Sequence, residues 1–559
     1  MTDPGPARRL ALYLLYAVVA AVLTFPVTAQ SAIEHLSFED RLGTVPVEVG
    51  VVHNGYSIVD TGALGSVYVA RTGALGLGLL LRVTGPPTAG GTLASYVDPA
   101  FVRANAATIS EPGRVGDAYA GRLAGEFVGD LWPRALLAAL LGGFVLLRVA
   151  HPALLRVAPG RRRTLAACIG ALGLLVASSG LAVWQHLTWQ GSDEPGELYG
   201  MSSVPGLSFD SPQIRELAVQ VRPFVDKNRE RLLDRADRYE RLAGGSVRAG
   251  VNAAAADLQP REGERIVVVE ADPQGSQVGT EVRRVLYDEL ADAVGTEALL
   301  ARTISGDVTS NGTVAEQRFV EDEVGASGEL PVVAVKGDHD SRTTVGQLED
   351  AGASVPDREV VEESDLRFTG GADPEFKSLF GGSVSNPSGV TPEERGAEVR
   401  ASVEDDDPDE PVRVLLHQND AALGYLGLPD MTALRALPGP GDPGFTRPVE
   451  DGVDDLPPGS VAYGHWHESG GPWVVWNTGG DEVTWTLVDQ VGTSGGVEEQ
   501  PTFNRFSTPY SPPLKPIELR LHYVDTDSGL VTGFVSMSLS ISGELTISRR
   551  TDVGVPLSR

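Results

Sequence analysis

The feature that most constrains this fold is a set of apolar segments near the N-terminus, because a chain crosses a bilayer only as a helix or in a closed barrel. The first segment, residues 10–29, has twenty uncharged residues and follows Arg8 and Arg9. Twenty helical residues match a hydrocarbon core of roughly 30 Å. The alternative is a cleaved signal peptide, since the small residues at 27–29 resemble a processing site. Both interpretations place the following residues outside the cytoplasm.

Two further apolar segments predict additional membrane helices. Residues 164–184 are uncharged and end at Trp184, a residue type that is common at membrane interfaces. Residues 135–147 are also uncharged but short for a span, so the flanking Arg134 and Arg148 would have to extend toward the interface. We therefore expect membrane helices at residues 1–30, 131–150 and 164–185.

The arginines predict how these helices are oriented. The loop 151–163 contains four arginines, and basic loops of this kind stay in the cytoplasm. The same rule places Arg8 and Arg9 there. We therefore expect a multi-pass protein of the cell membrane whose residues 31–130, and everything after residue 186, are extracytoplasmic. If the middle segment did not insert, the large C-terminal part would lie on the other side.

Composition excludes some classes of function. The formal net charge is -30, so the chain repels nucleic acid, and we expect no nucleic-acid partner. The bilayer is the expected contact of the N-terminal segments. The single cysteine, Cys168, excludes a fold held together by intramolecular disulfides. Nothing in the sequence determines the oligomeric state.

Three segments carry no recognisable chemistry. Residues 31–130 contain valine-rich runs separated by turn residues, which predicts a small β-rich extracytoplasmic segment. Residues 186–264 predict a linker and a helix that begins near Ser211 and ends at Gly244-Gly245. Residues 483–559 alternate apolar and polar positions, which predicts a C-terminal β extension.

The segment 265–482 predicts an α/β domain. It contains five apolar runs of strand length, at residues 265–272, 299–307, 330–340, 412–420 and 460–467. Helical periodicity between the first two runs indicates parallel strands joined by a crossover helix. Side chains at the carboxyl ends of parallel strands meet at one edge of the sheet, where ligands bind.

Each of these runs ends in residues that can bind a metal ion. They are Asp272 at the end of the first run and Gln274 just after it, Asp307 in the second, Asp338 and His339 in the third, His417 in the fourth, and His465 and His467 in the fifth. One polar turn after a strand is ordinary, but five in succession predict a common site. Carboxylates and imidazoles together suit Mn, Fe or Zn, whereas Ca or Mg seldom recruits so many histidines.

At these residues the chain resembles the calcineurin-like metallophosphoesterase superfamily. The ordered motifs of that superfamily are D-x-H, G-D-x-x-x-x-G, G-N-H-D/E, a histidine near a strand end, and G-H-x-H. The second and fifth motifs match at 306–312 and 464–467, and the first and third match in part. The resemblance covers about residues 265–480, which is under half of the chain.

This resemblance implies a fold and a set of roles. The fold is a metallophosphoesterase-type sandwich of two β-sheets flanked by helices, with two divalent cations at the edge of the sheets. The ligands implied for one cation are Asp272, Gln274 and His467, and those for the other are Asp338, His417 and His465. Asp307 would bridge both cations, and His339 would contact the phosphoryl group and protonate the leaving group. Hydroxide held between the cations would attack phosphorus in line.

Two residues depart from the motifs. Gln274 replaces a histidine with a weaker neutral ligand, which leaves a single cation as an open alternative. Asp338 replaces an asparagine with a carboxylate, which should tighten a cation and repel a phosphate. We expect a membrane-anchored, metal-dependent hydrolase of a phosphomonoester or phosphodiester. The alternative is a degenerate module of the cell envelope that binds or assembles without turnover.

Overall fold

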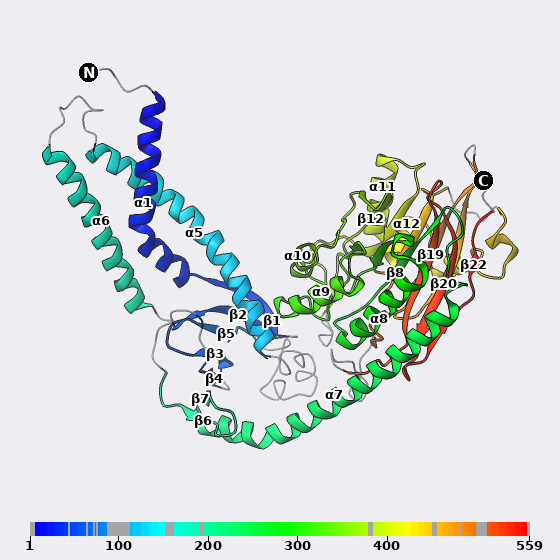
Figure 1. Cartoon of the computed structure of the whole chain (residues 1–559), viewed down its shortest axis with the longest axis horizontal. Coiled ribbons are helices and arrows are strands. Elements are labelled where there is room, and N and C mark those ends of the chain that lie inside the picture. Colours follow the sequence, from blue (N-terminus) through cyan, green and yellow to red (C-terminus); the bar gives the residue numbers. More distant parts are fainter. Residues whose placement is uncertain are drawn as a thin grey trace. The chain divides into compact units, whose positions relative to one another are not determined.

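The computed structural model places the chain in two compact units (Figure 1). The described residues are 6–42, 45–62, 65–70, 73, 76–85, 112–150, 161–189, 195–377, 384–449, 455–479, 482–498 and 511–555. Unit 1 comprises Met1–Asp40, Pro46–Pro86 and Gly116–Arg222, and unit 2 comprises Arg41–Val45, Pro87–Val115 and Pro223–Arg559.

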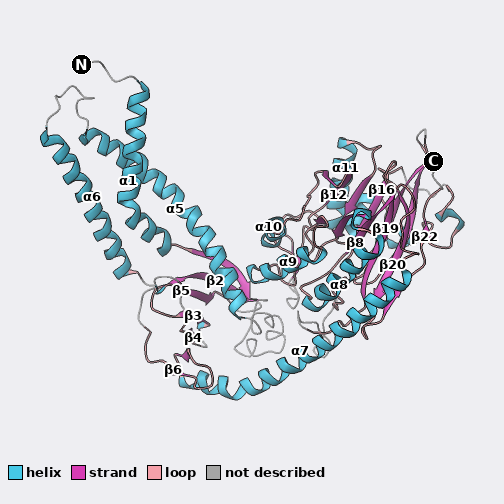
Figure 2. Cartoon of the chain, in the orientation of Figure 1, coloured by secondary structure: helices cyan, strands magenta, loops and turns pink. Residues whose placement is uncertain are grey.

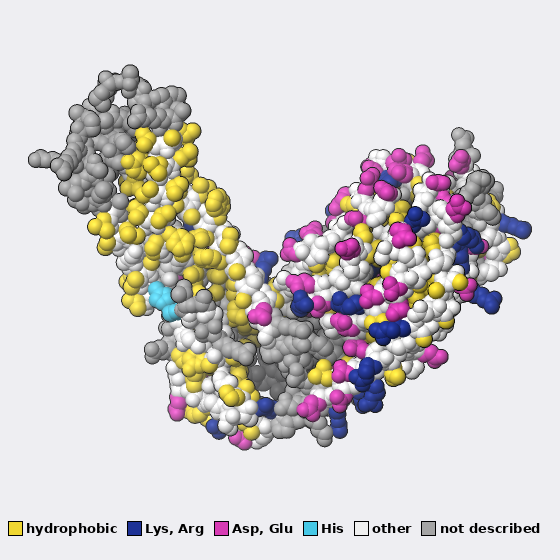
Figure 3. Space-filling model, viewed as in Figure 1, with side chains coloured by type: hydrophobic (Ala, Val, Ile, Leu, Met, Phe, Trp, Pro, Cys, Tyr) yellow, Lys and Arg dark blue, Asp and Glu magenta, His cyan; other side chains and the backbone are white. Residues whose placement is uncertain are grey.

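Three long helices dominate unit 1: α1 (Pro6–Glu34), α5 (Pro112–Ala150) and α6 (Arg161–Thr188). Two of them are long and apolar enough to cross a membrane, over Leu10–Glu34 and Val115–Leu147. Their apolar side chains face outward and form the yellow surface in Figure 3. The third predicted span coincides with α6, but side chains 161–171 and residues 151–160 of the predicted basic loop lie outside the described part.

Small residues let α1 and α5 pack closely. A Cβ added at Gly143 would lie 2.7 Å from Cα of Ala17, and one added at Gly142 would lie 2.8 Å from Cβ of Ala20. Contacts of this kind hold helices together where the surroundings are as apolar as the side chains. Gly142 and Gly143 therefore let α5 pack against α1 within unit 1.

The β-rich segment is shorter than the predicted 31–130. Helix α5 already begins at Pro112, so the residues from 112 to 130 are helical, and the middle helix is much longer than the predicted 131–150. Seven strands form one sheet in the order β1-β2-β5-β3-β4-β7-β6. Their bounds are Ser37–Leu42, Val45–Val52, Ser57–Asp60, Ser66–Val69, Gly78–Val83, Tyr199–Gly200 and Leu207–Phe209 for β1 to β7.

Unit 2 is a mixed α/β domain with one seven-stranded and one six-stranded sheet. The first has the order β10-β9-β8-β19-β20-β21, in which β10, β9 and β8 are parallel. The second has the order β11-β12-β15-β16-β18-β17, in which β12, β15, β16 and β18 are parallel. The predicted parallel strands are confirmed as β8 (Glu264–Glu270), β9 (Leu299–Ile304), β10 (Val332–Ala334), β15 (Val412–Leu415) and β16 (Gly459–Tyr463).

The remaining strands complete these sheets. They are β11 (Val361–Glu363), β12 (Leu366–Gly370), β17 (Gly470–Asn477), β18 (Thr484–Gln490), β19 (Ile517–Asp525), β20 (Val531–Leu539), β21 (Leu545–Ile547) and β22 (Thr551–Asp552), which pairs with β20. A separate pair joins β13 (Phe376–Lys377) to β14 (Val384–Ser385). The segment 483–559 is therefore part of both sheets, and β19 lies at the centre of the first, between β8 and β20.

One apolar cluster joins the facing sides of the two sheets. It includes Val267 and Val269 of β8 together with Phe368 of β12 and Trp476 of β17. Helices cover the opposite sides (Figure 2). The first sheet packs against α7 (Pro212–Ala254) and α8 (Gln277–Val294), and the second against α11 (Pro392–Asp406) and α12 (Asn419–Leu426). Smaller helices α9 (Gln317–Val324), α10 (Arg342–Asp350) and α13 (Met431–Arg435) fill the connections.

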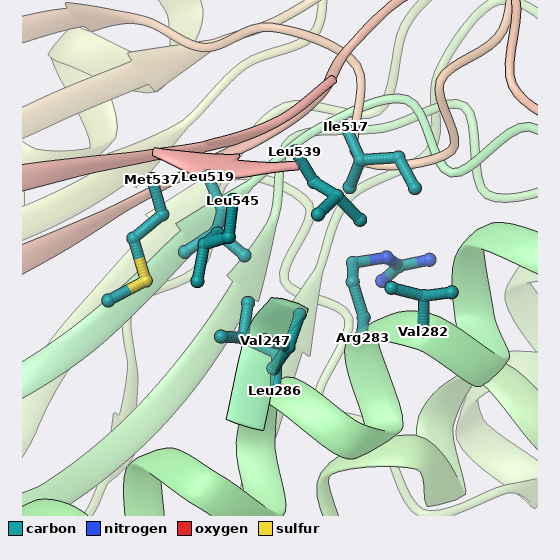
Figure 4. Close-up of a pocket in the computed structure, with 9 residues that line it drawn as sticks. All are labelled: Val247, Val282, Arg283, Leu286, Ile517, Leu519, Met537, Leu539 and Leu545. Carbon is teal, nitrogen blue, oxygen red and sulfur yellow. The ribbon is translucent and has the colours of Figure 1, made fainter. Parts of the chain in front are cut away.

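Helix α7 continues through its predicted stop. It passes Gly244-Gly245 and ends at Ala254 because Ala243, Val247 and Val251 on this segment are fully buried against the first sheet. Figure 4 shows Val247 of α7 and Leu286 of α8 directed toward the strand residues Leu519 and Met537. Burying one such side chain contributes about 1.5–3 kcal/mol, which outweighs the cost of about 1 kcal/mol for each helical glycine.

Close contact between α11 and α12 fixes the helix that follows His417. A Cβ added at Gly396 would lie 1.8 Å from the carbonyl oxygen of Ala421, and one added at Gly424 would lie 1.9 Å from that of Glu393. Both approaches are to backbone, which cannot rotate away. Glycine is therefore required at both positions for these helices to keep their spacing.

We predict that Gly396→Ala lowers the free energy of unfolding by about 1–3 kcal/mol, the typical cost of overpacking. Gly346→Ala is the matched control, because nothing lies within 4 Å of a Cβ added there in α10. That variant should be neutral or more stable by up to about 1 kcal/mol. Urea denaturation of the full-length protein measures both. Equal stability of the two variants would contradict the close-packing account.

Candidate metal centre

The predicted ligands lie together at the carboxyl ends of five strands. Asp272 and Gln274 follow β8, Asp307 follows β9, and Asp338 and His339 follow β10. His417 follows β15 of the second sheet, and His465 and His467 follow β16. Because β8 to β10 are parallel in one sheet and β15 and β16 are parallel in the other, each set of loops meets at one edge. Contacts of His417 with Asp307 and Asp338 join the two sets of loops.

Five of these eight residues have a left-handed backbone. Their φ angles are 52° at Asp272, 44° at Gln274, 53° at Asp307, 72° at His465 and 54° at His467. Residues other than glycine rarely adopt this region, and each such residue costs of order 1 kcal/mol or more. The backbone at the strand ends is therefore strained at five of the predicted ligands, a cost in local stability.

The tightest group of ligand atoms surrounds His417. Its Nε2 lies 3.3 Å from Oδ1 of Asp307, 3.5 Å from Oδ1 of Asp338 and 3.2 Å from Nδ1 of His465. The same Nδ1 of His465 lies 3.8 Å from Oδ2 of Asp338. These side chains come from both sheets, so this group forms only when the domain is fully folded.

A second group surrounds Asp272. Its Oδ1 lies 3.7 Å from Nε2 of His467 and 3.8 Å from Nδ1 of His417. The backbone N–H of His465 donates to both carboxylate oxygens of Asp272, at 3.1 and 3.0 Å. The Gln274 amide donates to Oδ2 of Asp307 at 3.0 Å, which ties Gln274 to the predicted bridging carboxylate.

Backbone carbonyls orient three of the imidazoles. Nδ1 of His417 lies 3.0 Å from the oxygen of Ser305, that of His467 lies 2.8 Å from the oxygen of Val497, and that of His339 lies 3.1 Å from the oxygen of Ser310. A carbonyl only accepts, so Nδ1 carries the proton and Nε2 is directed at the carboxylates. Metal-binding histidines are commonly held in this way.

The donor set fits a metal ion. Three groups of side chains have ligand atoms within 4.8 Å of one another: Asp338, His417 and His465; Asp272, Asp307 and His417; and Asp307, Asp338 and His339. Buried Oε1 of Gln274, Oδ1 of Asp338 and Nε2 of His467 have no hydrogen-bond partner. Buried polar atoms without partners are costly, and a bound cation would satisfy them.

The electrostatics of the cluster also favour a cation. Burial raises the pKa of Asp272 well above its usual value. Burial acts in the same direction on Asp307, but the neighbouring His417 and His339 hold its pKa well below the usual range. Burial opposes protonation of His417, yet Asp307 and Asp338 raise its pKa well above normal. A metal ion would replace the proton of His417 as the counter-charge, so cation binding should release protons.

Sequence reasoning missed three residues that support the site. Asp340 accepts backbone N–H groups of Val308, Thr309 and Gly337 at 2.8 to 3.0 Å, which fixes the Asp307 and Asp338 loops to each other. The Lys336 ammonium donates to three backbone carbonyls, including that of Gly337. Asp373 follows β12 and is buried, and burial raises its pKa to about 6. The position of Asp373 after a strand was the sequence signal that could have identified it.

Comparisons with known proteins add little to this geometry. No protein-family model matches the chain, and no curated protein sequence matches it. Among solved structures, TT1561 of Thermus thermophilus matches with a TM-score of 0.26 and 11% identity, covering 51% of this chain and 98% of that one. This likeness is too slight to bear on fold or activity.

We predict that His467 makes the metal-free protein sensitive to acid. Burial lowers the pKa of His467 to about 3, whereas an unfolded histidine titrates near 6.5. Below about pH 6.5 the unfolded chain binds the extra proton, so the stability contributed by neutral His467 is complete above that pH and lost as the pH falls toward 3.

Replacement of His467 should remove this dependence. Between pH 7.5 and 5, EDTA-treated His467→Gln should lose about 2 kcal/mol less unfolding free energy than the wild type, measured by urea denaturation. His35→Gln, at an exposed histidine outside the site, serves as the control and should behave as the wild type. An equal loss in all three proteins would contradict the burial of a neutral His467.

Proposed function

We propose that this chain is a membrane-anchored, metal-dependent phosphoesterase of the calcineurin-like metallophosphoesterase type, acting on a phosphomonoester or phosphodiester. The observation that carries the proposal is the meeting of five strand-end loops, in the order of the superfamily's motifs, in one buried cluster of carboxylates and imidazoles. The buried ligand atoms without hydrogen-bond partners at this edge also support the proposal, since a bound cation would satisfy them.

The layers of unit 2 support the same proposal. Two sheets share an apolar cluster, helices cover their outer sides, and the site lies at the carboxyl ends of parallel strands. This arrangement agrees with a metallophosphoesterase-type two-sheet sandwich. The predicted C-terminal extension supplies β19 at the centre of one sheet, so it belongs to the proposed catalytic domain.

The donor set suits two divalent cations of Mn, Fe or Zn. Asp338, His417 and His465 would hold one cation, and Asp272, Gln274 and His467 would hold the other, with Asp307 between them. Bound cations would polarise the phosphate and activate water for attack on phosphorus. The chain itself orients the ligands through the carbonyls of Ser305 and Val497.

The contacts of His339 support a role in proton transfer. The Ser310 carbonyl holds its Nδ1, and its Nε2 lies 4.0 Å from Oδ2 of Asp307 and 3.9 Å from Oδ1 of Asp338. Its backbone N–H donates to Oδ1 of Asp307 at 2.8 Å, so ring and carboxylate are fixed together. We infer that His339 contacts the phosphoryl group and protonates the leaving oxygen.

One observation favours the second candidate, a degenerate module that binds without turnover. The Gln274 amide donates to Oδ2 of Asp307, an oxygen that a bridging ligand would need. Its own Oε1 is buried without a hydrogen-bond partner and could bind a cation weakly. If the cation assigned to Asp272, Gln274 and His467 were held weakly, the site would bind a single metal ion without turnover.

Strand pairing supports three membrane crossings with the site outside the cytoplasm. Strand β4 precedes α5 in the chain, β7 follows α6, and the two strands pair antiparallel over Val67–Val69 and Leu207–Phe209. Both must lie on the same side of the membrane, so the α5 and α6 segment crosses an even number of times. With α1 as a further span, the arginine rule then favours an extracytoplasmic position for the proposed catalytic domain.

The direct test of the proposal is hydrolysis by the full-length protein in detergent. With Mn, the wild type should cleave bis(p-nitrophenyl) phosphate or p-nitrophenyl phosphate. Asp307→Ala and His465→Ala should each lower kcat/KM at least about a hundredfold, because metal catalysis contributes several kcal/mol and 1.4 kcal/mol is a factor of ten. Asp405→Ala, at an exposed acid on α11, is the control and should retain full activity.

The outcomes separate the two candidate functions. Turnover that these two substitutions abolish supports the hydrolase. A folded wild type that binds Mn but cleaves neither ester with Mn, Fe or Zn supports the binding module. Turnover that survives both substitutions would show that the catalytic centre lies elsewhere.

A further inference from the structure

Lysine is rare in this chain, and three of its four lysines are adjacent to the candidate metal centre. The sequence contains only four lysines, Lys227, Lys336, Lys377 and Lys515, in a chain of net charge -30. Lys336 precedes Gly337 of the third motif. Lys515 pairs with Glu468, the neighbour of His467, at 3.4 Å. Lys377 donates its backbone N–H to the carbonyl of Asp338 at 2.7 Å.

The cluster is open at His465. The side chain of His465 is 17% exposed, whereas those of His417, His467 and Asp272 are at most 1% exposed. Among these side chains, His465 is therefore the one that an approaching molecule can contact most readily. The residues that surround His465 determine which molecule can enter.

Lys377 lies beside the cluster on the chain that follows β12. Its backbone N–H donates to the carbonyl of Asp338, a predicted ligand of the same cation as His465. Lys377 is half-buried in β13, and among the described residues no carboxylate lies within ion-pair distance of its ammonium. Lys336 and Lys515 differ, since carbonyls and Glu468 already occupy their ammonium groups. Lys377 therefore has a charge available for an incoming anion.

Trp466 supplies an apolar surface at the same opening. It lies between His465 and His467 in sequence, and it is 38% exposed. Its indole N–H donates to Oδ1 of Asn419 at 2.9 Å, which fixes the ring against α12. An exposed, oriented indole beside a buried polar cluster is suited to stack on a planar organic group.

Resting on the proposed function, we propose that Lys377 and Trp466 form the substrate-recognition rim of the metal centre. Lys377 binds an anionic oxygen of the phosphate and offsets the negative charge that Asp338 adds beside it. Trp466 stacks on a planar group attached to that phosphate. The substrate class is thus a phosphate ester with an aromatic or heteroaromatic organic part.

Ligand binding tests this rim independently of turnover. Isothermal titration calorimetry would use the Mn-loaded full-length protein with inorganic phosphate and with phenylphosphonate, which has no ester bond to hydrolyse. Lys377→Met should weaken both ligands roughly tenfold, because both carry the anion. Trp466→Ala should weaken phenylphosphonate roughly tenfold and leave inorganic phosphate unchanged, because only the former has a ring to stack.

Conservative substitutions and a distant lysine serve as controls. Lys377→Arg and Trp466→Phe should retain affinity for both ligands within about threefold. Lys227→Met, which removes the lysine on α7, should leave both affinities unchanged. Wild-type-like binding by Lys377→Met, or equal weakening of both ligands by Trp466→Ala, would overturn the proposal. The predicted pattern in a protein without turnover would support the rim while refuting the hydrolase.

Discussion

The structure of the candidate site depends on positive charge that compensates a buried cluster of carboxylates. Three carboxylates, Asp272, Asp307 and Asp338, lie within a few ångströms of shared imidazoles and are almost fully buried. Uncompensated charges in such surroundings cost several kcal/mol each, so positive charge must accompany them. In the metal-free protein the proton on His417 supplies part of it. A bound metal ion would supply more, and it would also satisfy the polar atoms that have no hydrogen-bond partner.

The rest of unit 2 serves to hold that cluster in place. Each sheet contributes some of the predicted ligands, and the apolar cluster between the sheets sets the distance between the sheets. Asp340 joins two of the loops through backbone N–H groups, and the close contact of α11 with α12 positions the segment after His417. Left-handed residues at the strand ends are the local cost of this convergence. Unit 1 contributes apolar helices and a sheet. The strands of this sheet come from chain segments before α5 and after α6.

Much of the site was predictable because its signals are local. Each of these buried strands is a short apolar run, and metal-binding residue types follow it closely, so the sequence predicted the strand and the candidate ligand from the same segment. The errors came from long-range packing. The stop predicted at Gly244-Gly245 in α7 was wrong because buried residues beyond it pack on the sheet, and the β-rich segment was predicted too long because α5 begins at Pro112. The central place of β19 and the roles of Asp340 and Lys336 depend on contacts that no local pattern encodes.

The most direct test of the central claim is anomalous diffraction from crystals of the full-length protein grown with Mn. The account predicts at least one strong anomalous peak within coordination distance, roughly 2.0–2.3 Å, of Asp307 and the imidazole nitrogen Nε2 of His417. A second peak near Asp272 and His467 would indicate the two-cation form. Crystals with ordered Asp307 and His417 side chains but no anomalous peak beside them would contradict the claim.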